Sequence, residues 1–114
     1  MFAVIFEVTP LNEGRDGYLA LAARLKSLLE NQPGLVSIER FQSLVQEDKL
    51  LSLSFWEDDA SIGEWRNIMD HRSAQKKGKT ALFKSYRIRV ARIVRDYSDN
   101  DRDHAPGDSN QALL

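Results

Sequence analysis

The chain has 114 residues, of which 42% are hydrophobic and 29% are charged, and this is the composition of one globular domain. It has no cysteine, which excludes disulfides, thiolate metal sites and a cysteine nucleophile and leads us to expect a reducing, cytoplasmic location. Two histidines are too few for a convincing metal site. No apolar run approaches the length of about 18 residues that a membrane-spanning helix needs, and the first residues lack the pattern of a secretory signal.

The net charge of −1 conceals three blocks of opposite sign. Residues 1–65 sum to −6, residues 66–95 to +9, and residues 96–114 to −4. A basic block of this kind can bind phosphate or nucleic acid, or it can be a solvated helix face with outward strand positions. We favour the second interpretation, because no nucleic-acid-binding motif accompanies the block.

Residues 2–9 are β-branched and aromatic and stop at Pro10, which predicts a strand. Its even positions are apolar, and its odd positions include Ala3 and Ile5 as well as Glu7. Because both sets contain apolar residues, neither face of this strand is expected to be fully solvated.

A helix is predicted over residues 14–31, where apolar side chains recur at helical spacing. They are Tyr18, Leu21, Leu25, Leu28 and Leu29. Pro33 and Gly34 end the segment, because proline cannot continue a helix and glycine accepts the chain reversal.

Residues 35–45 and 49–57 are predicted to form an antiparallel hairpin that turns at residues 46–48. In the second strand Leu51, Leu53 and Phe55 lie on one face. The other face carries Leu50, Ser52, Ser54 and Trp56. Again both faces are at least partly apolar.

A second helix is predicted to start after Asp58 or Asp59, which are good N-cap residues, and Ser61 and Glu64 have capping-box spacing. We expect it to bend near Asp70, to resume through about Lys77 and to end at Gly78. A long last strand is predicted over residues 82–97, with a bulge where the alternation slips at residues 92–94.

The order strand, helix, strand, strand, helix, strand predicts a ferredoxin-like α+β fold, with a four-stranded antiparallel sheet and both helices on one face. The bare face would expose a large apolar patch. We therefore expect a homodimer in which two sheets stack face to face as a dimeric α+β barrel. The domain should span residues 1–97, and the polar tail 98–114 should be disordered or packed on the partner.

Three segments resemble one known family. They are residues 32–41 (QPGLVSIERF), residues 54–62 (SFWEDDASI) followed by Trp65, and residues 71–78 (HRSAQKKG). Over residues 1–97 the chain is similar to the antibiotic biosynthesis monooxygenase domain family of dimeric α+β barrels, in its small bacterial branch. That family includes cofactor-free quinone-forming oxygenases, heme-degrading enzymes and members of unknown role.

The resemblance implies a cleft between the helices and the sheet, lined in active members by a strand-one asparagine and a helix-borne tryptophan. Trp65 matches the tryptophan, whereas Glu7 stands where the asparagine is expected. The heme-ligand histidine of the heme-degrading branch would fall near Gln75, not at His71. We therefore expect no cofactor and no heme.

Cofactor-free oxygenation needs a base, a donor that holds the resulting anion, and a dry aromatic pocket. An inward-facing Glu7 would have its pKa raised by desolvation and could act as the base, and His71 could take the proton or donate a hydrogen bond. Trp65, Trp56 and Phe83 would supply the aromatic wall, and Arg72 could pair with an anion. The candidate catalytic residues are thus Glu7 and His71, and the candidate substrate-binding residues are Trp65, Trp56, Arg72 and Phe83.

Each candidate also has a structural interpretation. Trp65 has ordinary core spacing, and Trp56 ends a strand and could cap the core. His71 could be a cap or a surface hydrogen-bonding group, and Glu7 could pair with Arg or Lys across the sheet. His104 lies in the tail and is expected to be inert.

Two functions stay open at this point. The first is a monooxygenase that acts on a small, electron-rich, phenol- or hydroquinone-like aromatic. The second is a non-catalytic small-ligand-binding or stress-related dimer on the same scaffold. An RNA-binding module shares the element order, but residues 49–56 lack its base-stacking aromatic pattern. We expect neither a nucleic-acid nor a membrane partner.

Overall fold

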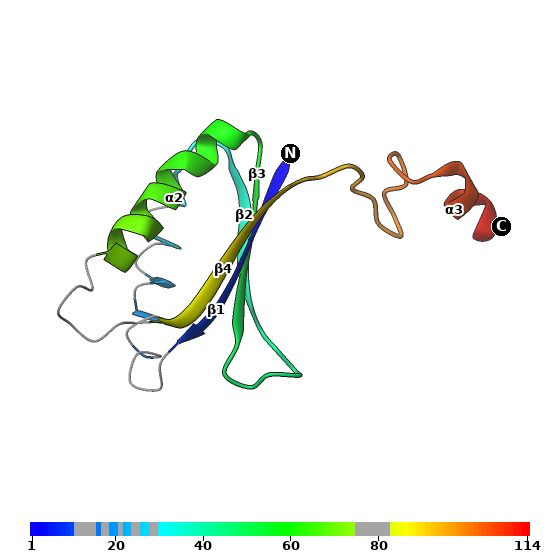
Figure 1. Cartoon of the computed structure of the whole chain (residues 1–114). Coiled ribbons are helices and arrows are strands. Elements are labelled where there is room, and N and C mark those ends of the chain that lie inside the picture. The colour runs from blue at the N-terminus through cyan, green and yellow to red at the C-terminus, as the bar shows by residue number, and fades with distance from the viewer. Residues whose placement is uncertain (11–15, 17–18, 21, 24–25, 28–29, 75–82) are drawn as a thin grey trace.

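A computed structural model of the chain describes residues 1–10, 16, 19–20, 22–23, 26–27, 30–74 and 83–114. The elements are β1 (Phe2–Pro10), β2 (Leu35–Gln42), β3 (Leu50–Trp56), α2 (Asp59–Ala74), β4 (Phe83–Arg92) and α3 (Gly107–Ala112). The described residues between 16 and 27 are helical. Figure 1 shows the sheet with α2 along one face, and α3 apart from it at the end of the C-terminal segment.

The four strands form one sheet in the order β2-β3-β1-β4. Each pair of neighbours is antiparallel. The predicted α+β ferredoxin-like fold is therefore confirmed. β1 and β3 are the two central strands, and β1 carries the contacts to both β3 and the edge strand β4.

The outer strands are shorter than predicted, for local reasons. β2 ends at Gln42, where the Ser43 N–H donates to the Lys49 carbonyl and closes the hairpin at 3.0 Å. β4 ends at Arg92, because its partner Phe2 is the first residue of β1. The predicted bulge at residues 92–94 is wrong. The register instead shifts at Pro10, which has no N–H for the ladder.

The helix α2 runs without interruption through Asp70, so the predicted bend is also wrong. Its N-terminus is capped by the Asp58 carboxylate, which accepts from the Ser61 N–H at 2.8 Å and from the Ser61 hydroxyl at 2.6 Å. These hydrogen bonds lower the pKa of Asp58. Glu64 accepts from the Gln32 side-chain amide instead of closing a capping box.

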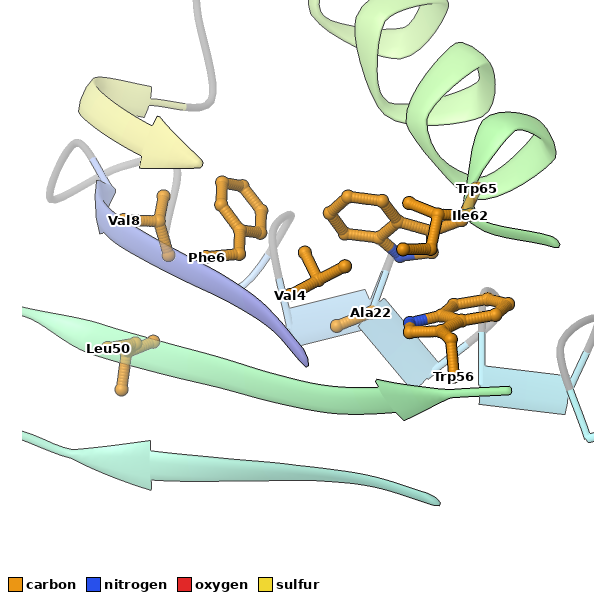
Figure 2. Close-up of a cluster of buried hydrophobic side chains, with 8 residues drawn as sticks. All are labelled: Val4, Phe6, Val8, Ala22, Leu50, Trp56, Ile62 and Trp65. Atoms are coloured by element: carbon orange, nitrogen blue, oxygen red, sulfur yellow. The ribbon is translucent and has the colours of Figure 1, made fainter. Parts of the chain in front are cut away.

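The core lies between the helices and one face of the sheet (Figure 2). Even-numbered residues of β1 point into it, and the neighbouring strand and helices complete it. Its buried members are Val4, Phe6, Val8, Ala22, Leu50, Trp56, Ile62 and Trp65. Ala22 belongs to the first helical segment, and its carbonyl accepts from the Arg40 guanidinium of β2 at 2.9 Å.

Residues 98–114, predicted to be disordered or packed on a partner, contain turns and the short helix α3. Packing on a partner stays a prediction. None of the helices in the described ranges is long and apolar enough to cross a membrane.

Gly34 is required by two features of the turn before β2. Its φ is +89°, a conformation that residues with a Cβ rarely adopt, and an added Cβ would overlap the Ser61 side chain. Its carbonyl also accepts from the Glu57 N–H at 2.7 Å, which ties β2 to the start of α2.

We expect Gly34→Ala to lower the free energy of unfolding by about 2 kcal/mol or more, because it adds both backbone strain and a steric overlap. Gly107→Ala is the matched control: its added methyl group meets no atom within 4 Å. Guanidinium denaturation followed by circular dichroism measures both variants. Equal stabilities for the two variants would contradict the role assigned to Gly34.

Candidate functional site

Three aromatic side chains meet on the helix-covered side of the sheet and are here called the aromatic cluster: Phe6, Trp65 and Tyr86. The Phe6 ring meets the Trp65 ring edge to face, with centroids 5.8 Å apart and an interplanar angle of 78°. It meets the Tyr86 ring in the same way, at 5.9 Å and 86°. β1, α2 and β4 thus each contribute one ring to the cluster, in the geometry that aromatic pairs prefer.

The aromatic cluster leads from the core to the surface. Phe6 and Trp65 are buried, whereas Tyr86 is 47% exposed on the edge strand. Along the same side of β4, Ile88 is partly buried against the core and Val90 is 45% exposed. Tyr86 and Val90 thus form a partly exposed apolar strip on the edge strand, with the buried Phe6 and Trp65 rings behind it.

Trp56 lies deeper in the same core and does not reach the surface. It is fully buried, and its indole Nε1–H donates to the Ser54 hydroxyl at 2.9 Å. Ser54 is buried as well. In the single subunit Trp56 is therefore a core residue that packs beneath the aromatic cluster.

Glu7 lies on the opposite face of the sheet from both tryptophans, because it alternates with Phe6 and Val8 along β1. Its carboxylate is 31% exposed and contacts Lys49 Nζ at 3.3 Å and an Arg89 guanidinium nitrogen at 3.4 Å. The hydrogen bond from Lys49 and the positive charges of Lys49 and Arg89 lower the pKa of Glu7. The predicted raised pKa is therefore wrong, and the alternative of a cross-strand ion pair is confirmed.

Around Glu7 the sheet is hollowed by a pocket of about 360 Å³, here called the basic hollow. Its charged lining consists of Lys49, Arg87 and Arg89 together with Glu7. The hairpin residue Gln46 closes one side. Three cations and one carboxylate make this hollow an anion-attracting feature, and Tyr86 of the aromatic cluster also belongs to its lining.

The remaining candidates are placed only by their backbone. His71 and Arg72 belong to α2, and Phe83 opens β4 opposite Pro10. Their side chains lie outside the described residues, so their predicted roles stay predictions. In the part of the chain that the structure describes, no group of three or more His, Cys, Asp or Glu side chains could hold a metal.

Sequence reasoning missed Phe6 and Tyr86 as site residues. The signal for Tyr86 was present, because it alternates with Ser85 and Arg87 in the last strand and so shares a face with Ile88. The approach of Phe6 to Trp65 depends on how α2 crosses the sheet, which no local pattern specifies.

The fold agrees with what known proteins indicate. Residues 1–77 match the family described as "Antibiotic biosynthesis monooxygenase". The chain belongs to this family.

Two known sequences are similar to this one over most of the chain. The first is "Jasmonate monooxygenase ABM" of Pyricularia oryzae, with 38% identity over 101 residues, 89% of this chain and 47% of that protein. The chain thus spans about half the length of this relative. The second is the uncharacterized protein YqjZ of Bacillus subtilis, with 31% identity over 104 residues, 90% of this chain and 89% of that protein.

Solved structures share the fold at low sequence identity. Rv0793 of Mycobacterium tuberculosis has a TM-score of 0.69 at 19% identity, covering 85% of this chain and 98% of that one. SnoaB of Streptomyces nogalater, a cofactor-independent oxygenase, has a TM-score of 0.65 at 12% identity, covering 83% and 94%. The heme-degrader MhuD of Mycobacterium tuberculosis has a TM-score of 0.60 at 17% identity, covering 86% and 100%.

The ion pairs of Glu7 predict a specific loss of stability in acid. A carboxylate with a lowered folded-state pKa stabilises the fold above its ordinary pKa of 4.5 and loses this contribution as the pH falls through the lowered value. We expect Glu7→Gln to flatten the dependence of unfolding free energy on pH below 4.5.

Denaturation with urea from pH 7 down to the acid limit of folding measures this dependence. Glu39→Gln is the control, because the described part of the chain gives Glu39 no ion pair. An unchanged acid dependence in Glu7→Gln would refute the stabilising role of the ion pairs.

Proposed function

We propose that the protein is a cofactor-independent monooxygenase that acts on a small, electron-rich aromatic of the phenol or hydroquinone type. The observation that carries this proposal is the aromatic cluster, which joins a buried Trp65 to a half-exposed Tyr86. Membership of the monooxygenase family supports the reaction type. The jasmonate monooxygenase relative supports it further for the region that it shares.

The reaction needs no external reductant. Removal of the phenolic proton gives a phenolate that can transfer an electron to dioxygen, and the two radicals recombine as a C–O bond to a ring carbon. The resulting hydroperoxide loses water and leaves a quinone carbonyl. A phenol and one dioxygen thus give one quinone and one water, and the substrate supplies all four electrons.

We assign the proton transfer to His71, because neutral imidazole accepts a proton near physiological pH. Arg72 is proposed to pair with the phenolate. α2 supports the role of Arg72 at the backbone level, since positions 65 and 72 are two turns apart and lie along one side of the helix. Phe83, at the start of β4, is proposed to extend the aromatic wall.

Glu7 is left out of this mechanism. It lies across the sheet from the aromatic cluster and is held by two cations, so it is a poor proton acceptor. No cofactor enters the proposed reaction, and neither heme nor a metal is needed for its electron balance.

A second function is favoured by one specific observation. The place of the strand-one asparagine of active family members holds Glu7, and Glu7 is occupied by ion pairs. A non-catalytic protein that binds a small ligand on the aromatic cluster would be compatible with this change. Such a protein would bind the aromatic tightly and release it unaltered.

We also propose that two copies form a dimer through the face of the sheet opposite α2, here called the open face. Apolar side chains of the central strands occupy its middle, namely Ile5, Leu51, Leu53 and Phe55. In the single subunit none of these four side chains is fully buried. Stacking two such faces would remove this apolar surface from water. A cytoplasmic location is proposed with it.

We expect His71→Ala to lower kcat/KM by about 100-fold, because a general base contributes on this order to the rate. Glu7→Gln should stay within about twofold of the wild type if the reaction takes place on the helix side. Oxygen uptake with a panel of hydroquinones and naphthols, with product analysis, measures both. Hemin titration monitored by absorbance tests whether the protein binds heme, and we expect no binding.

Each outcome separates the alternatives. A value of kcat/KM for His71→Ala equal to that of the wild type would remove His71 from the mechanism. A large loss of kcat/KM in Glu7→Gln would indicate that Glu7, on the open face, is the base. Tight binding of the panel with no oxygen uptake would favour the non-catalytic function.

The dimer has its own test. Leu53 pairs with Ile5 in the middle of the open face, and Leu53→Asp would place a charge between the stacked sheets. We expect this variant to sediment as a single subunit at concentrations where the wild type is a dimer. Leu19→Asp is the control, because Leu19 is 40% exposed on the first helical segment. A monomeric wild type at micromolar concentration would overturn the proposal.

A further inference from the structure

We propose that residues 93–114, here called the arm, dock on the β2–β3 hairpin end of a second copy of the chain. This inference rests on the proposed dimer. The arm would bind through exposed apolar side chains and through aspartates that face the basic hollow of the partner.

The arm leaves its own sheet and then makes no hydrogen bonds to it. The Ile93 N–H donates to the Met1 carbonyl at 2.9 Å, as the last link to the strands. Every hydrogen bond found beyond residue 96 in the described part of the chain joins two residues of the arm. Figure 1 shows the arm running away from the sheet, on the side opposite α2.

The arm nevertheless has a defined local structure. The Arg102 guanidinium donates to Asn110 Oδ1 at 3.0 Å and to the Ser98 carbonyl at 3.1 Å. It also lies over the Tyr97 ring, 4.9 Å from its centre. Arg102 thereby joins α3 to the turn at residues 98–101, so the arm can present a fixed surface.

The arm exposes four large apolar side chains, two near each of its ends. Val94 is 78% exposed, Tyr97 41%, Leu113 69% and Leu114 103%. α3 has no buried residue. These side chains pack on no core of their own, so contact with a partner would remove their apolar surface from water.

The hairpin end of the sheet offers a matching surface. Leu44 and Val45 stand at its tip and are 101% and 99% exposed. The turn that carries them is pinned, because the Ser43 hydroxyl accepts from the N–H groups of Val45 at 3.2 Å and Gln46 at 3.0 Å. The Gln42 amide donates across the turn to the Lys49 carbonyl at 3.0 Å.

The charges of the two surfaces are complementary. The basic hollow lies beside the hairpin. Glu7 partly neutralises Lys49 and Arg89, and Arg87 adds a third positive charge to the lining. From residue 96 onward the arm has five aspartates against Arg102 alone. An acidic segment against a basic hollow gains favourable electrostatic energy and a defined orientation.

The topology keeps the arm and the hairpin of one subunit apart. The arm leaves from the end of the sheet where Phe2 pairs with Trp56 and with Arg92. At the opposite end, which carries the hairpin, Val8 pairs with Leu50 and with Tyr86. A two-fold axis that lies between the two stacked open faces and runs across the strands would bring opposite ends of the two sheets together. Each arm would then reach the hairpin of its partner, and the contact would occur twice.

The test uses the full chain, which has no cysteine of its own. Gln46→Cys in the hairpin and Asp103→Cys in the arm are combined in one chain and treated with a short bismaleimide. We expect a covalent dimer whose peptides contain the 46–103 link. A 46–103 cross-link formed within one chain, or the absence of any 46–103 cross-link, would overturn the inference.

Sedimentation of the same sample separates this inference from the proposed dimer. A sample that sediments as a dimer but gives no 46–103 link refutes arm docking alone. A sample that sediments as a single subunit refutes both the dimer and the docking.

The charge contribution is tested by reversal in the same background. Arg87→Glu should lower the yield of the 46–103 link about threefold, which is the scale of one partly exposed ion pair. Asp99→Lys added to Arg87→Glu should restore it. Arg66→Glu, on the exposed side of α2, is the matched control and should leave the yield unchanged. Equal yields for Arg87→Glu and Arg66→Glu would overturn the role of the basic hollow.

Discussion

The structure depends on the apolar character of β1 on both of its sides. Its even-numbered residues Val4, Phe6 and Val8 are buried beneath the helices. Its odd-numbered residues point to the open face, where Ile5 lies among the leucines of β3. Because β1 is a central strand, the same nine residues hold both the aromatic cluster on one side and the proposed contact between subunits on the other.

Much of the fold could be predicted because its signals are local. The β-branched runs, the turn at Gly34 and the N-cap at Asp58 each act within a few residues, and all three lie where the sequence indicates. The errors lie where a partner decides the outcome. β4 stops at Arg92, which pairs with Phe2 at the start of β1, and this depends on the register between strands distant in the sequence.

The candidate site was harder to predict for the same reason. Glu7 faces Leu51 and Arg87 directly, and its cations come from diagonal positions: Arg89 from β4, and Lys49 from the residue just before β3. Diagonal neighbours cannot be assigned before the register is known. Alternation along β1 does, however, separate Glu7 from Phe6, so the sequence already contained the reason why Glu7 and Trp65 lie on different sides of the sheet.

The location of both indoles has a practical consequence for spectroscopy. Trp56 and Trp65 are the two tryptophans of the chain, and both are buried in one core. Trp65 touches Phe6, whose ring in turn touches the partly exposed Tyr86, whereas Trp56 is held by Ser54 in the layer beneath. Intrinsic fluorescence therefore originates in this one core, and the exposure of either indole to water on unfolding would shift its emission.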